Sequence, residues 1–223
     1  MSGAGTRPAA VLFDCDGVLV DSEAITNRLL RDDLAGRGLD LPLEQIMTLS
    51  VGGTMEGVAD AARQRGAILP DDWVDQFYKT MFAGLEHEVE AVPGVRAVLD
   101  ILIAADIKIA VGSNGPRAKM DITLRRTDMM ERLCPHIYSA RDLDHPKPAP
   151  DVYLHAAAQL GVSPDACVVV EDSASGAKAA VAAGMRCIGF APALMPSNQA
   201  TKLARHCDVV IADMAALTGH LGL

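Results

Sequence analysis

The sequence lacks the features of a disulfide-bonded, zinc-binding or membrane-spanning protein. Its 223 residues include only five cysteines, and no two of them form a CxxC pair. An odd number of scattered cysteines argues against a disulfide framework or a zinc site, so we expect reduced, buried thiols in a cytoplasmic protein. The apolar segments are short and interrupted by charge, well under the roughly 18 residues of a membrane span. We also expect no signal peptide, since no long apolar stretch with a cleavage site follows the start.

An excess of positive charge is also missing. The formal net charge is -9, and an acidic surface repels phosphate backbones, so nucleic acid is not an expected partner. A small anionic metabolite would still require a locally positive site. We find no internal repeat or low-complexity tract, and hydrophobic residues make up 50% of the chain, which predicts a packed core.

Three apolar runs that stop at polar residues predict buried parallel strands, at 9–14, 107–115 and 166–173. Helical spacing follows at 150–161, with Gly161 at its end, and an alanine-rich helix is closed by Gly184 and followed by a further strand. Strands that alternate with helices predict an α/β fold with a Rossmann-like, doubly wound parallel sheet.

Residues 22–92 interrupt this alternation. They show four consecutive helical patterns and no convincing strand, so we expect an all-helical domain inserted after the first strand. The catalytic core would then comprise residues 1–21 and 93–223, with 22–92 as a cap. Most of the acidic excess falls in this insert, and Pro93 with Gly94 provides plausible hinge material.

Polar residues gather where the predicted strands end. Asp14 and Asp16 follow the first strand, and the others that we expect at the same sheet edge are Ser113, Asn114, Lys147, Glu171 and Asp172. Ligands of open α/β sheets bind beyond the carboxyl ends of the strands. Each fragment alone is common, but their shared edge indicates one functional site.

The chemistry that suits these residues is phosphoryl transfer. At an effective dielectric constant of about 20, two like charges 4 Å apart repel each other by roughly 4 kcal/mol. A carboxylate and a phosphate dianion therefore repel each other by several kcal/mol, so a cation is needed. Magnesium takes oxygen ligands, which Asp14 and Asp172, with or without Glu171, would supply. Lys147 adds a fixed positive charge.

Two aspartates would then share the covalent chemistry. We expect Asp14 to attack phosphorus and form an aspartyl-phosphate, while Asp16 protonates the leaving alkoxide and later deprotonates the hydrolytic water. Ser113, Asn114 and backbone N–H groups after Asp14 would donate hydrogen bonds to the phosphate oxygens.

The ordered motifs resemble those of the haloacid dehalogenase superfamily. They are Asp14-Cys15-Asp16-Gly17-Val18, Ser113-Asn114, Lys147-Pro148, and Glu171-Asp172-Ser173 with Gly176 and Ala183-Gly184 behind. The resemblance covers about residues 9 to 190. It is greatest to the subgroup of phosphoglycolate phosphatases, beta-phosphoglucomutases and bacterial sugar-phosphate phosphatases, which include 6-phosphogluconate phosphatase.

This resemblance implies a Rossmann-like core with a small helical cap, an aspartyl intermediate and Mg2+ as cofactor. It also implies that the backbone carbonyl of Asp16 is a third protein ligand of the metal, beside Asp14 and Asp172. Glu171 would either ligate the metal directly or hold a bound water. The substrate would be a small phosphorylated metabolite, namely a sugar or sugar-acid phosphate.

Three alternatives compete with a phosphatase. Family dehalogenases lack the second acid, whereas Asp16 is present here. Beta-phosphoglucomutases carry a histidine and an arginine where this chain has Thr26 and Met55, which argues against a mutase but leaves it as the main alternative. Receiver-like regulatory domains are about half this length and have no helical insert.

Selectivity among phosphate esters would come from residues around the cap and beside the Ser113-Asn114 turn. The candidates are Glu23, Thr26, Thr54, Met55, Arg117 and Lys119. Gly52 and Gly53 form either a cap loop that contacts substrate or an ordinary turn. The six histidines show no metal-ligand spacing, and His145 lies close enough to Lys147 in sequence to be a further candidate for the lining of the site.

Overall fold

A computed structural model describes residues 7–50, 54–192 and 198–223 of the chain. Its contacts form two compact units, Met1–Asp21 with Glu90–Leu223 and Ser22–Val89. We call the first the core unit and the second the helical unit, and each is described by itself. Gly52 and Gly53, candidates for a substrate loop, lie outside the described residues.

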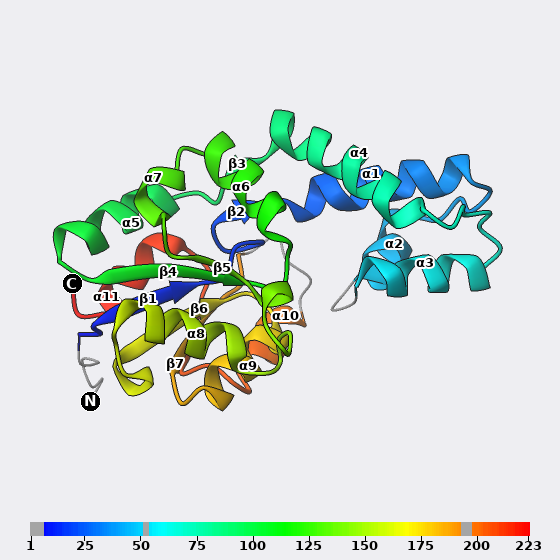
Figure 1. Cartoon of the computed structure of the whole chain (residues 1–223). Helices are drawn as coiled ribbons and strands as arrows, with labels where there is room; N and C mark the ends of the chain where they lie inside the picture. Colours follow the sequence, from blue (N-terminus) through cyan, green and yellow to red (C-terminus); the bar gives the residue numbers. More distant parts are fainter. Residues whose placement is uncertain (1–6, 51–53, 193–197) are drawn as a thin grey trace. The chain divides into compact units, whose positions relative to one another are not determined.

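One parallel sheet organises the core unit (Figure 1). Within the described residues it has six strands in the order β5-β4-β1-β6-β7-β8. Their bounds are Ala10–Phe13 (β1), Lys108–Ser113 (β4), Ile137–Ser139 (β5), Cys167–Glu171 (β6), Arg186–Phe190 (β7) and Val209–Ile211 (β8). The predicted Rossmann-like α/β fold is confirmed.

Helices cover both faces of this sheet. They are α5 (Val95–Ala104), α6 (Arg117–Arg126), α7 (Met130–Leu133), α8 (Asp151–Leu160), α9 (Ala174–Ala182), α10 (Gln199–Leu203) and α11 (Leu217–His220). In Figure 1, α8 and α9 lie on one side of the sheet, and α5 and α11 lie on the other. The described part of the unit also contains three short 3-10 turns, at Ala140–Asp142, Pro164–Ala166 and Met214–Ala216.

The central strands are apolar at every position because both of their faces are covered. All four residues of β1 are fully buried. Ala10 and Leu12 belong to the core that also contains Ala156 of α8 and Ala180 of α9. The small alanines let both helices approach the sheet closely. This packing fixes β1 between β4 and β6, so the residues that follow these three strands meet at one edge.

The two shortest parallel strands and a small ribbon escape the sequence patterns. β5 and β8 have three residues each, too few to show an apolar run. The ribbon pairs Val20–Asp21 (β2) with Glu90–Ala91 (β3) in antiparallel fashion. Since β3 falls within residues 22–92, the expectation of no strand there is wrong by this one two-residue element.

The helical unit comprises α1 (Glu23–Gly36), α2 (Leu43–Ser50), α3 (Met55–Gln64) and α4 (Trp73–Glu88). Its core forms where α1 packs on α4, with Leu30, Leu34, Trp73 and Leu85 fully buried. Gly84 allows close packing there, because a Cβ atom would lie 2.6 Å from a methyl carbon of Leu29 and the leucine would have to shift.

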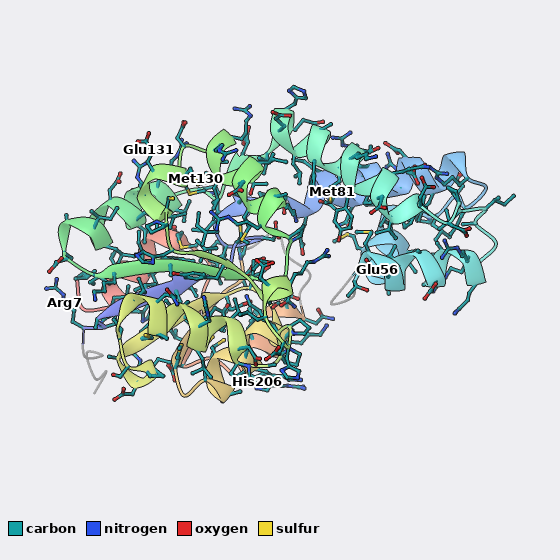
Figure 2. The ribbon with its side chains drawn as sticks, in the orientation of Figure 1. Arg7, Glu56, Met81, Met130, Glu131 and His206 are labelled. Atoms are coloured by element: carbon teal, nitrogen blue, oxygen red, sulfur yellow. The ribbon has the colours of Figure 1, made fainter. Side chains whose placement is uncertain are left out.

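Two hydrogen-bonding and packing details specify this unit further. The indole of Trp73 donates to Asp33 at 2.6 Å, and its ring stacks on Phe77. Figure 2 labels Met81 of α4, which is buried in the unit, and Glu56 of α3, which is exposed.

Among the described helices of the whole chain, none has the length and apolar character needed to cross a membrane.

Candidate active site

The loop after β1 turns sharply back on itself. The Cys15 carbonyl accepts hydrogen bonds from the N–H groups of Leu19 and Val20, and the Gly17 N–H donates to the Val20 carbonyl. At the start of this loop, the Asp14 N–H donates to the Val170 carbonyl of β6 at 3.0 Å. Asp14 is therefore fixed at the carboxyl end of the sheet, with its side chain mostly buried.

Gly17 permits both the turn and its closeness to the end of β6. Its φ of +81° lies in the left-handed region that favours glycine. A Cβ atom at this position would overlap the Asp172 carboxylate. The backbone of the 14–17 loop and the side chain of Asp172 are thus in close contact, as a shared metal site would require.

Lys147 links the carboxylates of two strands. Its ammonium lies 2.5 Å from Asp14 Oδ1 and 2.6 Å from Glu171 Oε1, and it also donates to the Tyr153 hydroxyl at 2.7 Å. The Asn114 side chain holds the backbone of this lysine, because its Oδ1 accepts from the Lys147 N–H and its Nδ2 donates to the Lys147 carbonyl.

Glu171 is completely buried, and protein donors contact both of its oxygens. Oε1 accepts from Lys147 and from the Tyr153 hydroxyl at 2.7 Å. Oε2 accepts from the N–H and the hydroxyl of Ser173. Gly176 allows this arrangement, since a Cβ there would overlap the Glu171 carboxylate. These bonds compensate the cost of burying the charge.

The pKa values in this cluster reflect burial and charge. Burial raises the pKa of Asp14 to about 7, against the lowering effect of Lys147, while Glu171 and Asp16 raise it further. For Lys147, burial acts to lower the pKa, but the carboxylates of Asp14 and Glu171 dominate and raise it. Lys147 therefore stays protonated beside the two carboxylates, whereas burial disfavours the ionised form of Asp14.

Asp16 has a separate cation. The Lys119 ammonium lies 2.7 Å from Asp16 Oδ1, and both side chains are largely buried. Burial acts to lower the pKa of Lys119, but the Asp16 carboxylate raises it. Lys119 belongs to the first turn of α6, which begins just after the Ser113-Asn114 turn.

A model of the haloacid dehalogenase-like hydrolase family matches residues 8–184, which contain all of these side chains. The chain belongs to this family. The predicted family membership is thus confirmed, and so is the expectation of an enzyme of the hydrolase class.

Two curated relatives are phosphatases. The hydrolase is 32% identical to 6-phosphogluconate phosphatase of Escherichia coli K12 over 187 residues, which cover 83% of each chain. It is 30% identical to hexitol phosphatase B of the same strain over 94% of each chain. The prediction that the chain is a phosphatase enzyme agrees with both.

A solved structure is similar over nearly the whole length. The HAD family hydrolase of Deinococcus radiodurans R1, crystallised with bound phosphate and sodium, is 36% identical to this hydrolase. The TM-score is 0.82, and the match covers 97% of each chain.

The core unit of the hydrolase brings the predicted catalytic residues to one edge of the sheet. Asp14 and Asp16 follow β1, Ser113 ends β4, and Glu171 ends β6. The Ser113 hydroxyl is buried and accepts from the Gly115 N–H.

The candidates for substrate selectivity are divided between the units. Arg117 is held within the core unit by Asp121 and by the Ile137 carbonyl. Glu23 and Thr26 lie on α1, and Met55 begins α3. Thr54 is the N-cap of α3, where its hydroxyl accepts from the Gly57 N–H.

Thr26 differs from the other buried polar groups of the described chain. Its hydroxyl is buried and has no hydrogen-bond partner there. His145, a candidate because of its place near Lys147 in the sequence, is exposed and contacts Asp151.

Two contributors to the site of the hydrolase were not predicted as such. Tyr153 follows the helical spacing of a core residue, and it is indeed fully buried, but its hydroxyl contacts Lys147 and Glu171. Ser173 caps α9 by accepting from the Gly176 N–H, and it also donates to Glu171. A Ser-x-x-Gly sequence at the start of a helix indicates that the serine is the N-cap. No local pattern indicates that this serine also contacts the carboxylate of Glu171.

The charges of the site fit a divalent cation. Asp14, Asp16, Glu171 and Asp172 supply four formal negative charges, and Lys119 and Lys147 supply two positive ones. No group of three or more acidic, histidine or cysteine side chains forms a metal cage in the part of the chain that is described. Magnesium needs no such cage, because it is held by one or two carboxylates and keeps several waters.

Proposed function

We propose that this hydrolase is a magnesium-dependent phosphomonoesterase with Asp14 as its nucleophile. The observation that carries the proposal is the buried contact of the Lys147 ammonium with Asp14 and Glu171, beside a second aspartate, Asp16. A buried nucleophile next to a permanent cation suits attack on an anionic phosphorus centre.

Asp14 and Asp172 would hold the metal through their side chains, and Asp16 through its backbone carbonyl. Magnesium would supply charge neutralisation between Asp14 and the phosphoryl oxygens. Glu171 is the least suited of the predicted ligands, since protein donors contact both of its oxygens. We propose that it orients Lys147 instead.

The reaction would proceed in two displacements. An Asp14 oxygen bonds to phosphorus while the ester P–O bond breaks, and Asp16 gives its proton to the leaving oxygen. Water then loses a proton to Asp16 and attacks phosphorus, which releases inorganic phosphate and free Asp14. Lys147 and the Ser113 hydroxyl would bind phosphoryl oxygens throughout.

Asn114 would serve this reaction in a different way from the one expected. Its side-chain amide accepts from the Lys147 N–H and donates to the Lys147 carbonyl. We propose that this amide fixes the lysine, and that donation to the phosphate comes from the backbone N–H groups after Asp14.

The proposed substrate is a small sugar or sugar-acid phosphate. The named activities of the two curated relatives support this class. Glu23, Thr26, Thr54 and Met55 remain the proposed selectivity residues of the helical unit. The proposed cytoplasmic location rests on the odd number of scattered cysteines in the sequence. The expectation of buried thiols is wrong for one of them, since Cys134 is exposed.

Phosphate release from a panel of esters tests this function. The panel should pair sugar-acid, hexitol and aldose phosphates, each assayed with magnesium, with EDTA and with the Asp14→Asn variant. We expect release from at least one ester with magnesium only, and none from the variant. Failure of the wild-type enzyme on every ester, including p-nitrophenyl phosphate, would refute the proposal.

A further inference from the structure

The Asp16–Lys119 ion pair is held more firmly than an ordinary surface pair. The 2.7 Å contact joins side chains that are only 13% exposed for Lys119 and 25% for Asp16. Most exposed pairs contribute little, because solvent screens them and both side chains lose freedom. Here burial reduces the screening, so the pair can define the position of the carboxylate.

The segment that carries Lys119 is itself anchored. The Gly115 N–H donates to Ser113 Oγ at 2.9 Å, and the Gly115 carbonyl accepts from the Ser139 hydroxyl at 2.7 Å. A Cβ atom on Gly115 would lie 3.5 Å from Asp16 Oδ2, so this turn packs against the carboxylate. Arg117 fixes the start of α6 through the Ile137 carbonyl.

We propose that Lys119 is a positioning residue for Asp16, holding its carboxylate in the orientation in which it exchanges protons with the leaving group and with water. This inference rests on the proposed phosphatase function. Segment 113–119 would then do two things at once, since Ser113 binds the phosphoryl group and Lys119 aligns the acid. A carboxylate without this partner would sample other rotamers, and small misplacements reduce proton transfer strongly.

A double-mutant cycle separates this role from a structural one. Lys119→Gln should lower kcat for an alkyl phosphate by roughly 10-fold to 100-fold, with little change in KM, because a misplaced acid acts on the chemical step. In an Asp16→Asn background, the same change should alter kcat by less than about twofold, since no acid remains to be positioned. Lys119→Arg should restore part of the activity.

The leaving group provides an independent measurement. Enzyme phosphorylation by p-nitrophenyl phosphate requires no proton donor, because p-nitrophenolate is a good leaving group. In a rapid-quench experiment, Lys119→Gln should therefore retain most of the wild-type burst rate. Lys178→Gln is the matched control, since this exposed lysine of α9 belongs to the same unit. Thermal melting of each variant establishes that it is folded, and Lys119→Met replaces Lys119→Gln if the latter is not.

Equal losses from the lysine substitution in the wild-type and Asp16→Asn backgrounds would overturn the proposal, as would equal losses for alkyl and p-nitrophenyl esters in the burst. A KM increase without a kcat decrease would also overturn it, and would point instead to direct contact with substrate. These results differ from failure of the proposed function, in which the wild-type enzyme would release no phosphate.

Discussion

At the scale of single residues, the site depends on how one ammonium group is shared. Lys147 contacts the carboxylates of Asp14 and Glu171 and the hydroxyl of Tyr153. All of these groups are buried, so each lost contact leaves a charge or dipole without compensation. The Tyr153 hydroxyl is the one member that can be deleted without altering formal charge.

Tyr153→Phe should therefore destabilise the fold by about 1–3 kcal/mol, because Lys147 and Glu171 each lose a buried partner. It should also reduce kcat/KM by roughly tenfold, since Lys147 is then held less precisely. Urea unfolding and phosphate-release kinetics would measure the two effects.

Tyr138→Phe is the matched control. The Tyr138 hydroxyl contacts His136 at 3.0 Å in a half-buried position away from Lys147. Its removal should cost less than about 1 kcal/mol and leave the kinetics unchanged. If the two variants behaved alike, the role given to the Tyr153 hydroxyl would be wrong.

The sequence places these residues only in part. Asp14 can be located because an apolar run ends at it, and the helical spacing of Tyr153 predicts burial. Neither pattern reveals that the Tyr153 hydroxyl contacts Glu171, because they lie 18 residues apart and meet only when α8 packs on the sheet. The Lys119 contact with Asp16 spans more than a hundred residues and is equally invisible to local patterns.

At the scale of elements, the 14–20 loop determines how close the first and fourth motifs come. The Gly17 backbone contacts the Asp172 carboxylate directly. Gly17→Ala should reduce activity by at least about 100-fold, because the new methyl group displaces Asp172 or the loop that carries Asp14 and Asp16. Metal titration of the remaining activity should show a higher magnesium requirement.

Gly161→Ala is the control that measures the effect of placing alanine at a positive φ without any steric clash. Gly161 also has a positive φ, of 64°, but nothing lies within 4 Å of its Cβ position. It ends α8, so alanine should cost about 1 kcal/mol of stability with normal activity. Normal activity in Gly17→Ala would contradict the close approach of Gly17 and Asp172.

Element prediction succeeds where a pattern is long enough to be recognised. The apolar strands β1, β4 and β6 match the expected segments within a few residues. The four helical patterns expected in residues 22–92 correspond to α1, α2, α3 and α4. β5 and β8 have three residues each, and β2 pairs with β3 over two residues each. Such short strands form because adjacent strands of the sheet supply their hydrogen bonds. These strands are distant in the sequence, so no local pattern predicts the pairing.

At the scale of the whole molecule, the net charge is -9, so the proposed function requires a bound cation that makes the site locally positive for an anionic substrate. EDTA should abolish phosphate release, magnesium should restore it, and calcium should inhibit it because calcium prefers more ligands at longer distances. Asp172→Ala should raise the magnesium concentration that gives half-maximal rate. Undiminished activity in excess chelator would remove the metal from the mechanism.

The helical unit bears on the choice between hydrolase and mutase. Thr26 and Met55 occupy positions where the resemblance to beta-phosphoglucomutases would require histidine and arginine. Incubation with beta-glucose 1-phosphate and a bisphosphate primer should give inorganic phosphate or no reaction. A coupled dehydrogenase assay would detect glucose 6-phosphate. Its efficient formation would show that the enzyme is a mutase instead.

Phosphorylation of Asp14 is the step on which the proposed function depends most, and mass spectrometry of the rapidly acid-quenched enzyme measures it directly. In the presence of magnesium and a phosphate ester that the enzyme hydrolyses, the peptide containing Asp14 should gain the mass of one phosphoryl group. Fragmentation of this peptide should place the phosphoryl group on Asp14. The Asp14→Asn variant and the EDTA-treated enzyme should show no gain. A phosphoryl group found on another residue, or full turnover by Asp14→Asn, would contradict the account.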